Sequence, residues 1–254
     1  MLAAERRERI ETALRSARVI STEELALLLD VSAETVRRDL IVLERSGKLS
    51  RVHGGALSAS QLVSEEAPFS DRSATARQPK SAIGRAGAAL VRPGQTVVFD
   101  VGTTVLEVAR ALPADFRGTV ATCSLLVAAE LASRPNIEVL VSGGRVRNGD
   151  LACSNAQTVA FFGDVRADIA FLGSGGVDVV AGLTDFHLDE VATRRMILAN
   201  TALCYALADS TKLGAVAPHR VCDLDALAGL ICDVRPAGSL EQALDRAGRI
   251  IVAA

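Results

Sequence analysis

The sequence is poor in aromatic residues, paired cysteines and clustered histidines. It contains no Trp, one Tyr and 3% aromatic residues in all, so it lacks the aromatic platforms on which bases or sugar rings stack. The five cysteines include no CxxC pair, and their odd number fits no closed disulfide set. We expect them to be buried thiols. The three histidines lack the spacing of zinc ligands. We therefore expect no metal and no cofactor.

Long apolar segments are also missing. The longest runs without Asp, Glu, Lys, Arg or His span 13 residues, at 151–163 and 196–208, whereas a membrane-spanning helix needs about 20 apolar residues. The N-terminus is charged from Glu5 onward and lacks the apolar region of a signal peptide. We therefore expect a cytoplasmic protein that makes no membrane contact.

The charge is nearly balanced, with a net value of −2 over 254 residues. This balance excludes a uniformly basic, histone-like protein, but it allows a local nucleic-acid site. The length suits one large domain or two modest ones. Residues 1–57 carry 10 Lys or Arg and 9 Asp or Glu, so any affinity for DNA must depend on where these charges lie.

The first 57 residues predict three short helices. Residues 5–17 carry an apolar stripe at helical spacing, and Ser21 with Glu24 forms a capping box that opens a helix over 22–29. Ser32 caps a third helix, 33–46, which Gly47 ends. A turn of three residues separates the second helix from the third. This arrangement is typical of a helix-turn-helix.

The third predicted helix has one apolar face and one charged face. Helical spacing places four apolar residues inward, namely Ala33, Val36, Leu40 and Leu43. The other side presents Glu34, Arg37, Arg38 and Arg45. An arginine fork can bond both O6 and N7 of guanine, and the first half of such a helix reaches base edges in the major groove. By itself, the same face also fits an ordinary solvated helix.

A short hairpin is predicted after this helix. Residues 48–53 alternate with a period of two and lead to Gly54 and Gly55. In this alternation Arg51 and His53 share one face. They are therefore candidates for contacts with phosphates or with the minor groove.

The stretch Val31-Ser-Ala-Glu-Thr-Val-Arg-Arg-Asp-Leu40, followed by Leu43, Gly47, Leu49, Arg51 and His53-Gly-Gly-Ala56, resembles the winged helix-turn-helix of the DeoR family of bacterial transcription regulators. The resemblance implies that the chain binds an operator in double-stranded DNA. The candidate DNA-binding residues are Ser32, Glu34, Thr35, Arg37, Arg38, Arg45, Lys48, Arg51 and His53.

Residues 58–79 have the composition of a linker, with small and polar residues and two prolines, Pro68 and Pro79. The family usually carries an acidic residue, an aromatic residue and an arginine here, and Glu66, Phe69 and Arg72 match them. The resemblance therefore implies an ordered tether.

Residues 80–254 predict alternating strands and helices. Apolar strands are expected at 96–100, 120–123, 137–141, 168–172, 203–208, 229–232 and 250–252. Helices are expected at 79–91, 104–112, 125–132 and 188–200. Continuous apolar strands between helices are typical of a mostly parallel sheet covered on both faces. The predicted fold class is α/β, with an N-terminal winged helix-turn-helix domain.

One loop has the features of a phosphate site. Asp100-Val-Gly102-Thr103-Thr104 follows an apolar strand and opens a helix, whose N-terminus favours an anion. Many such loops hold no ligand, so this pattern alone leaves both interpretations open. A second glycine-rich stretch, 173–178, lacks the third glycine of a dinucleotide-binding fingerprint and only weakly indicates NAD.

The C-terminal part also resembles the DeoR effector-sensing domain, for example at 100–104, 171–178 and 208–212. This resemblance implies a fold related to sugar-phosphate isomerases and a phosphorylated sugar or polyol as effector. The expected effector-binding residues are Lys80, Asp100, Gly102, Thr103, Thr104, Ser124, Gly175, Gly176, Asp178 and Lys212. The chain departs from the family pattern at 154–156, at Thr193 and at Cys232.

Two functions remain as hypotheses. The first is a regulator, most often a repressor of carbohydrate or polyol genes, that binds DNA as a dimer or tetramer. The second is a sugar-phosphate isomerase with an accessory DNA-binding module, in which Asp100, Asp178 or Asp185 would act as the base. Because Thr193 stands where a basic partner would be needed, we favour the regulator, which is not an enzyme.

Overall fold

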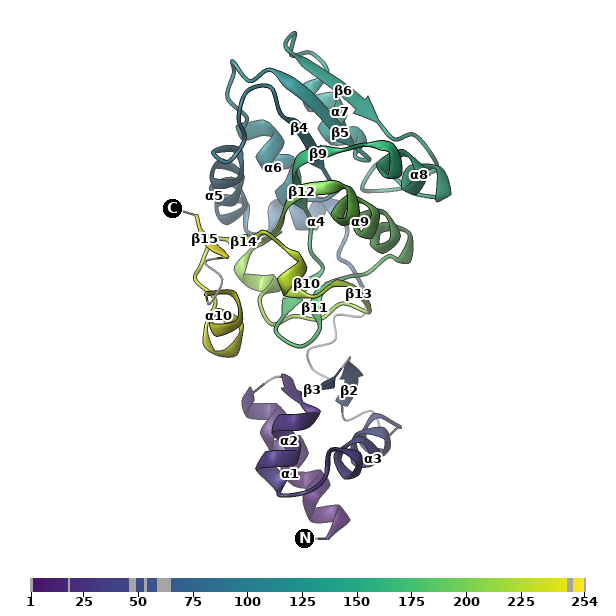
Figure 1. The fold of residues 1–254 in the computed structure, drawn as a ribbon, viewed down its shortest axis with the longest axis vertical. Helices are drawn as coiled ribbons and strands as arrows, with labels where there is room; N and C mark the ends of the chain where they lie inside the picture. Colours follow the sequence, from purple (N-terminus) through teal and green to yellow (C-terminus); the bar gives the residue numbers. More distant parts are fainter. Residues whose placement is uncertain are drawn as a thin grey trace.

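The computed structural model describes residues 2–17, 19–45, 49–52, 54–58, 65–245 and 249–253 (Figure 1). The N-terminal domain contains the helices α1 (Ala3–Ala17), α2 (Thr22–Leu29) and α3 (Ala33–Arg45). Its three short strands are β1 (Val19–Ser21), β2 (Leu49–Val52) and β3 (Gly55–Ser58), paired antiparallel in the order β1-β3-β2. The predicted winged helix-turn-helix is confirmed.

Local signals set the ends of the helices in this domain. The predicted capping box is present, with Glu24 N–H donating to Ser21 Oγ and Ser21 N–H donating to the Glu24 carboxylate. Asp30 ends α2 in the left-handed conformation, with φ 51°. Ser32 Oγ accepts from Thr35 N–H at 3.2 Å and opens α3. The predicted helix end at Gly47 lies outside the described residues.

One apolar core holds the three helices and the hairpin together, and it contains the predicted inward residues Val36, Leu40 and Leu43. Ala33, also predicted to face inward, is only half-buried. The sequence analysis missed Asp39, which is 5% exposed and forms an ion pair with Arg6 of α1. A carboxylate can lie in this core because the guanidinium compensates its charge.

The predicted linker contains regular structure. Helix α4 (Phe69–Ala74) lies within it, and α5 (Arg77–Ala88) begins before its end, with Pro79 in the first turn. Helix α4 has no fully buried residue.

The C-terminal domain is built on a seven-stranded sheet in the order β15-β14-β12-β9-β4-β5-β6, with every pair parallel. The strands are β4 (Thr96–Phe99), β5 (Gly118–Thr122), β6 (Ile137–Val141), β9 (Ala167–Leu172), β12 (Thr201–Ala208), β14 (Gly229–Cys232) and β15 (Ile250–Val252). The predicted α/β class with a mostly parallel sheet is confirmed.

Two hydrophobic clusters cover the two faces of this sheet. On one face pack α5, α6 (Thr103–Ala111) and α7 (Leu125–Leu131); on the other pack α8 (Ala156–Asp164), α9 (Leu188–Asn200) and α10 (Gly238–Asp245). Alternate strand residues divide between the clusters: Val97 and Phe99 join one, and Val98 joins the other. This alternation explains why the strands read as continuous apolar runs.

Several short elements were not predicted. They include α4, α8, α10 and the hairpin of β7 (Val146–Arg147) and β8 (Ala152–Cys153). A small antiparallel sheet is formed by β10 (Gly176–Asp178), β11 (Gly182–Asp185) and β13 (His219–Cys222). The glycine-rich stretch after β9 therefore leads into a hairpin.

The strand order changes direction between β4 and β9. From β4 the chain builds outward through β5 and β6, and it then returns to place β9 and β12 on the other side. Ligand sites in open parallel sheets lie beyond the carboxyl ends of the strands at such a switch point. We therefore expect a ligand site at the carboxyl ends of β4, β9 and β12.

Candidate functional site

The predicted recognition surface on α3 is exposed. The Arg37 and Arg38 side chains are 56% and 77% exposed. Both lie near Glu34, with Arg37 Nη1 3.7 Å and Arg38 Nε 3.4 Å from its carboxylate oxygens. Such exposed pairs contribute about 0–1 kcal/mol, so they exchange readily for contacts with a base or a phosphate.

The remaining predicted DNA-binding residues have different surroundings. Ser32 and Thr35 face each other at the start of α3, with their hydroxyls 2.9 Å apart. Arg51 joins the β2–β3 hairpin to α3, because its Nε donates to Glu44 Oε2 at 2.9 Å and its backbone N–H donates to Glu44 Oε1. Lys48, His53 and the side chain of Arg45 lie outside the described part of the chain.

A pocket of about 260 Å³ lies at the switch point of the large sheet. It is lined by the loop after β4, by Gly173 and Ser174 after β9, and by Leu207 and Asp209 at the end of β12. Residues from the α4 segment, which we define as residues 65–76, form a further wall. The predicted loop 102–104 is part of this lining.

The N-terminus of α6 forms part of the pocket lining. Gly102 has φ 126°, and a Cβ placed there would meet nothing within 4 Å, so the approach to the loop is open. Helix α6 has no side-chain cap, and its first backbone bond runs from Leu106 N–H to Gly102 O. Thr103 and Thr104 line the pocket at 8% exposure each. Uncapped N–H groups at a helix start favour an anion.

The two predicted lysines differ. Lys212 lines the pocket, lies 5.8 Å from the centre of the Phe186 ring and has no ion pair with any carboxylate in the described ranges. Lys80 is 6% exposed and donates from Nζ to the carbonyls of Arg72 and Thr75, near the end of α4. Burial lowers the pKa of Lys80, and the nearby Asp209 offsets this lowering only in part. Lys212 is thus the better placed cation for an incoming phosphate.

An arginine that the sequence analysis did not select forms the floor of the pocket. Arg194 of α9 is 2% exposed and contacts three carboxylates from different elements. Its Nε and Nη1 lie 2.5 Å from Asp100 and Asp185, and its Nη2 lies 3.4 Å from Glu190. Burial by itself lowers the pKa of Arg194, but these carboxylates outweigh it and raise that pKa above its usual value. Burial also raises the pKa of Glu190 to about 8, against the opposing effect of Arg194.

Several predicted effector residues do not line this pocket. Asp100 lies beneath it, where it accepts from Gly173 N–H at 2.9 Å and holds Arg194. Ser124 caps α7. Asp178 turns the β10–β11 hairpin by accepting from Val180 and Ala181 N–H, and burial raises its pKa. Gly175 and Gly176 pack closely against residues 184–186 and 215–217.

The sequence analysis missed some residues of the site, although the spacing of one pair of them indicated an ion pair. Glu190 and Arg194 are four residues apart in the predicted helix 188–200, a spacing at which opposite charges meet. The family resemblance had marked Arg72 in the tether, but nothing local indicated its ion-pair partner Asp150, which lies 78 residues away in the sequence.

The described residues include no group of three or more His, Cys, Asp or Glu that could hold a metal ion. Within the same ranges, no helix is long and apolar enough to cross a membrane. The five cysteines are free, and four of them are buried.

Two family models match the chain. The model described as the DeoR-like helix-turn-helix domain matches residues 6–62. The model described as the DeoR C terminal sensor domain matches residues 75–234.

Curated relatives match along most of the chain. The HTH-type transcriptional regulator GolR of Listeria innocua is 34% identical over 235 residues, covering 92% of this chain and 91% of the relative. The glycerol-3-phosphate regulon repressor of Escherichia coli is 32% identical over 225 residues, covering 89% and 88%. The HTH-type transcriptional repressor CsqR of Escherichia coli is 33% identical over 225 residues, covering 89% and 85%.

Solved structures show weaker likeness. Ribose 5-phosphate isomerase A from Methanocaldococcus jannaschii matches 54% of each chain at 15% identity, with a TM-score of 0.40. The probable sor operon regulator from Shigella flexneri matches 80% of this chain and 97% of its own, at 15% identity and a TM-score of 0.45.

Proposed function

The chain belongs to the DeoR family of transcription regulators, and from this premise we propose that it is a repressor of carbohydrate or polyol genes that a phosphorylated sugar or polyol releases from its operator. In this proposal residues 1–57 bind DNA, residues 58–79 are the tether and residues 80–254 sense the effector. The names of the relatives, which are regulators and repressors, support this function over the isomerase alternative.

The observation that carries the effector proposal is the uncapped N-terminus of α6 in the same pocket as Lys212, which has no ion pair within the described ranges. Residues 103–105, at the start of α6, and Lys212 all line this pocket. Together they supply donors and positive charge for one phosphate group. The names of relatives that regulate the glycerol-3-phosphate regulon and the aga operon are consistent with this class of effector.

The pocket lining also contains acceptors. Asp71, Asp150 and Asp185 are among its lining residues. Ionised carboxylates only accept hydrogen bonds, so they suit the hydroxyl groups of a sugar or polyol. The pocket thus offers donors for a phosphate and acceptors for hydroxyl groups.

Operator binding by a homo-oligomer, a dimer or a tetramer, completes the proposal. One small winged domain reads a short site, and paired half-sites add specificity. Sedimentation at micromolar concentration tests this part, and a monomer would contradict it.

The effector site is tested by thermal-shift screening of the full chain against sugar and polyol phosphates, each beside its unphosphorylated form. A native-state ligand raises the midpoint of unfolding, and only the phosphorylated forms should do so. The double variant Thr103→Ala, Thr104→Ala should keep its affinity for the operator and lose its response to any active compound. If this variant is still released normally, the threonine hydroxyls at the start of α6 do not hold the phosphate.

A further inference from the structure

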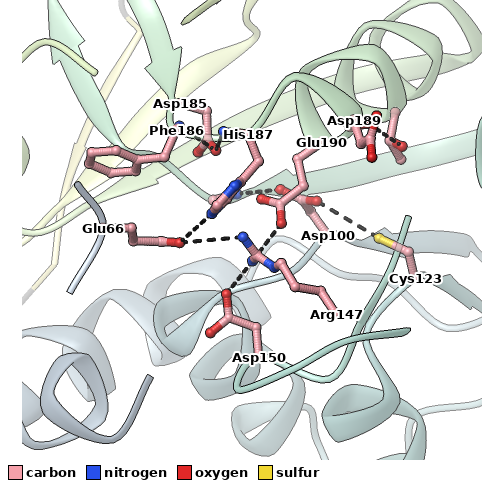
Figure 2. Close-up of polar contacts among 12 residues, drawn as sticks. Glu66, Asp100, Cys123, Arg147, Asp150, Asp185, Phe186, His187, Asp189 and Glu190 are labelled. Carbon is pink, nitrogen blue, oxygen red and sulfur yellow. Dashed lines mark hydrogen bonds and ion pairs between the residues drawn. The ribbon is translucent and has the colours of Figure 1, made fainter. Parts of the chain in front are cut away.

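A continuous series of ion pairs runs from the pocket floor to the α4 segment (Figure 2). Arg194 holds one oxygen of Glu190, and the other oxygen lies 2.6 Å from Arg147 Nη2. Arg147 also forms an ion pair with Asp150, and its Nη1 lies 3.7 Å from Glu66 Oε2. Glu66 belongs to the α4 segment, which follows the N-terminal domain in the chain.

The α4 segment is held in place mainly by polar contacts. Helix α4 has six residues and no fully buried side chain, and its apolar contact with the core is made by the partly buried Phe69, so its own helical stability and this packing fix it only weakly. Arg72 lies 2.6 Å from Asp150 and 3.0 Å from Glu66, and Lys80 Nζ donates to carbonyls at the end of the helix. Glu66 Oε2 also lies 3.2 Å from His187 Nε2.

Arg147 occupies the centre of these contacts. Its guanidinium meets three carboxylates from three parts of the fold: Glu66 of the α4 segment, Asp150 of the β7–β8 turn and Glu190 of α9. Figure 2 shows these carboxylates arranged around the arginine. Arg147 does not line the pocket, whereas Glu66, Asp150 and Glu190 do. These three carboxylates therefore lie between the pocket and the guanidinium of Arg147.

We propose that Arg147 is a positioning residue that couples the pocket to the α4 segment, and thereby to the DNA-binding domain. A ligand that hydrogen-bonds to Glu190 or Asp150 weakens the ion pair between that carboxylate and Arg147. The strength of the ion pair between Arg147 and Glu66 changes as a result. The α4 segment is the element with two arrangements, docked and released, that such a ligand biases. The coupling rests on the proposed effector site, whereas the anchoring of the segment by Arg147 does not.

The chain offers a matched control for Arg147. Arg145 lies two residues earlier, is 77% exposed and has Asp189 at 3.6 Å. The variants Arg147→Met and Arg145→Met remove the same charge from neighbouring positions. Amide hydrogen exchange of the full chain then compares the α4 segment with the central strands β9 and β12.

The anchoring is tested without any ligand. In Arg147→Met, the amides of α4 should exchange at least about tenfold faster than in the wild type, with β9 and β12 unchanged. Arg145→Met should match the wild type throughout. Unchanged exchange in α4, or an equal acceleration of the central strands as a merely structural role would give, overturns the proposal. If Arg147→Met does not fold, Glu66→Gln removes the segment's own carboxylate from the same guanidinium and carries the same prediction.

The coupling is tested with inorganic phosphate as the probe, at constant ionic strength. Phosphate should change α4 exchange in the wild type and in Arg145→Met by at least about threefold, and leave it unchanged in Arg147→Met. If phosphate raises the unfolding midpoint of the wild type but leaves its α4 exchange unchanged, the proposed coupling is wrong. If phosphate does not raise that midpoint, the proposed effector site fails and the coupling fails with it, while the anchoring is decided by the first experiment.

Discussion

The two domains use arginine in opposite ways. On α3 of the N-terminal domain, Arg37 and Arg38 are more than half exposed and share one carboxylate, that of Glu34. In the sensor pocket, Arg194 is 3% exposed at its side chain and contacts three carboxylates. The first arrangement leaves charge available to a partner, and the second uses charge to fix the position of the groups around it.

The physical basis of this difference is solvation. An exposed guanidinium stays hydrated, so its ion pairs are weak and exchange readily for contacts with phosphates or bases. A buried guanidinium has lost its water, so its partners must remain in place. Substitutions on the exposed face of α3 should therefore change the free energy of unfolding little, whereas substitutions in the pocket floor should lower it strongly.

The largest effect is expected from Arg194→Met. Removing this cation leaves Asp100 and Asp185 buried and uncompensated, which should lower the free energy of unfolding by about 3–5 kcal/mol. Arg38→Met, the same change on the exposed surface, should lower it by no more than about 0.5 kcal/mol. Urea denaturation of both variants measures the contrast. Equal losses would show that burial does not distinguish the two regions.

An intermediate effect is expected from the recognition surface. Arg37→Ala or Arg38→Ala should weaken operator binding by about 1–3 kcal/mol and relax the base preference, because a side chain that reads a base edge is lost. Unfolding free energies should stay at the wild-type value, in contrast to Arg194→Met. Gel-shift titrations against the operator and point-mutated operators measure both properties. Normal binding by both variants would rule out this helix face as the reading surface.

The smallest effect is expected from Ser21→Ala. It removes the hydroxyl that accepts from Glu24 N–H at the start of α2, at a cost of about 1 kcal/mol. This local loss should lower the stability of the N-terminal domain and leave the pocket unaffected. Thermal unfolding followed by domain-resolved hydrogen exchange measures it. A matching loss of protection in β9 or β12 would mean that the two domains unfold as one unit.

The regions also differ in how much of their structure could be predicted from the sequence. In the N-terminal domain, the capping box at Ser21, the turn after Asp30 and the start of α3 were all predicted, because each depends on residues within four positions. In the sensor domain, the strands 137–141, 229–232 and 250–252 and the helix 188–200 were predicted with the observed bounds. Other predicted ends differ by a few residues, as in α5, which spans 77–88 where 79–91 was expected.

The pocket was predicted only in part. The loop 102–104 was recognised because its glycine and threonines stand together between a strand and a helix. Asp178 was chosen from the resemblance to the family's sensor domain, yet it turns a hairpin outside the pocket lining. The glycine-rich pattern around it is shared by loops that bind ligands and by tight hairpins, and the pattern alone does not separate them.

The sequence alone determined the fold class, the winged helix-turn-helix and the position of the α6 loop, because caps, periodicity and turn residues act over a few positions. Only the tertiary structure decided which charges meet. Arg194 reaches Asp100 across 94 residues, and Arg72 reaches Asp150 across 78. Such pairs depend on the strand order and on the burial that the assembled sheet and its covering helices create. The pocket floor and its connection to the α4 segment exist only once those distant segments have packed together.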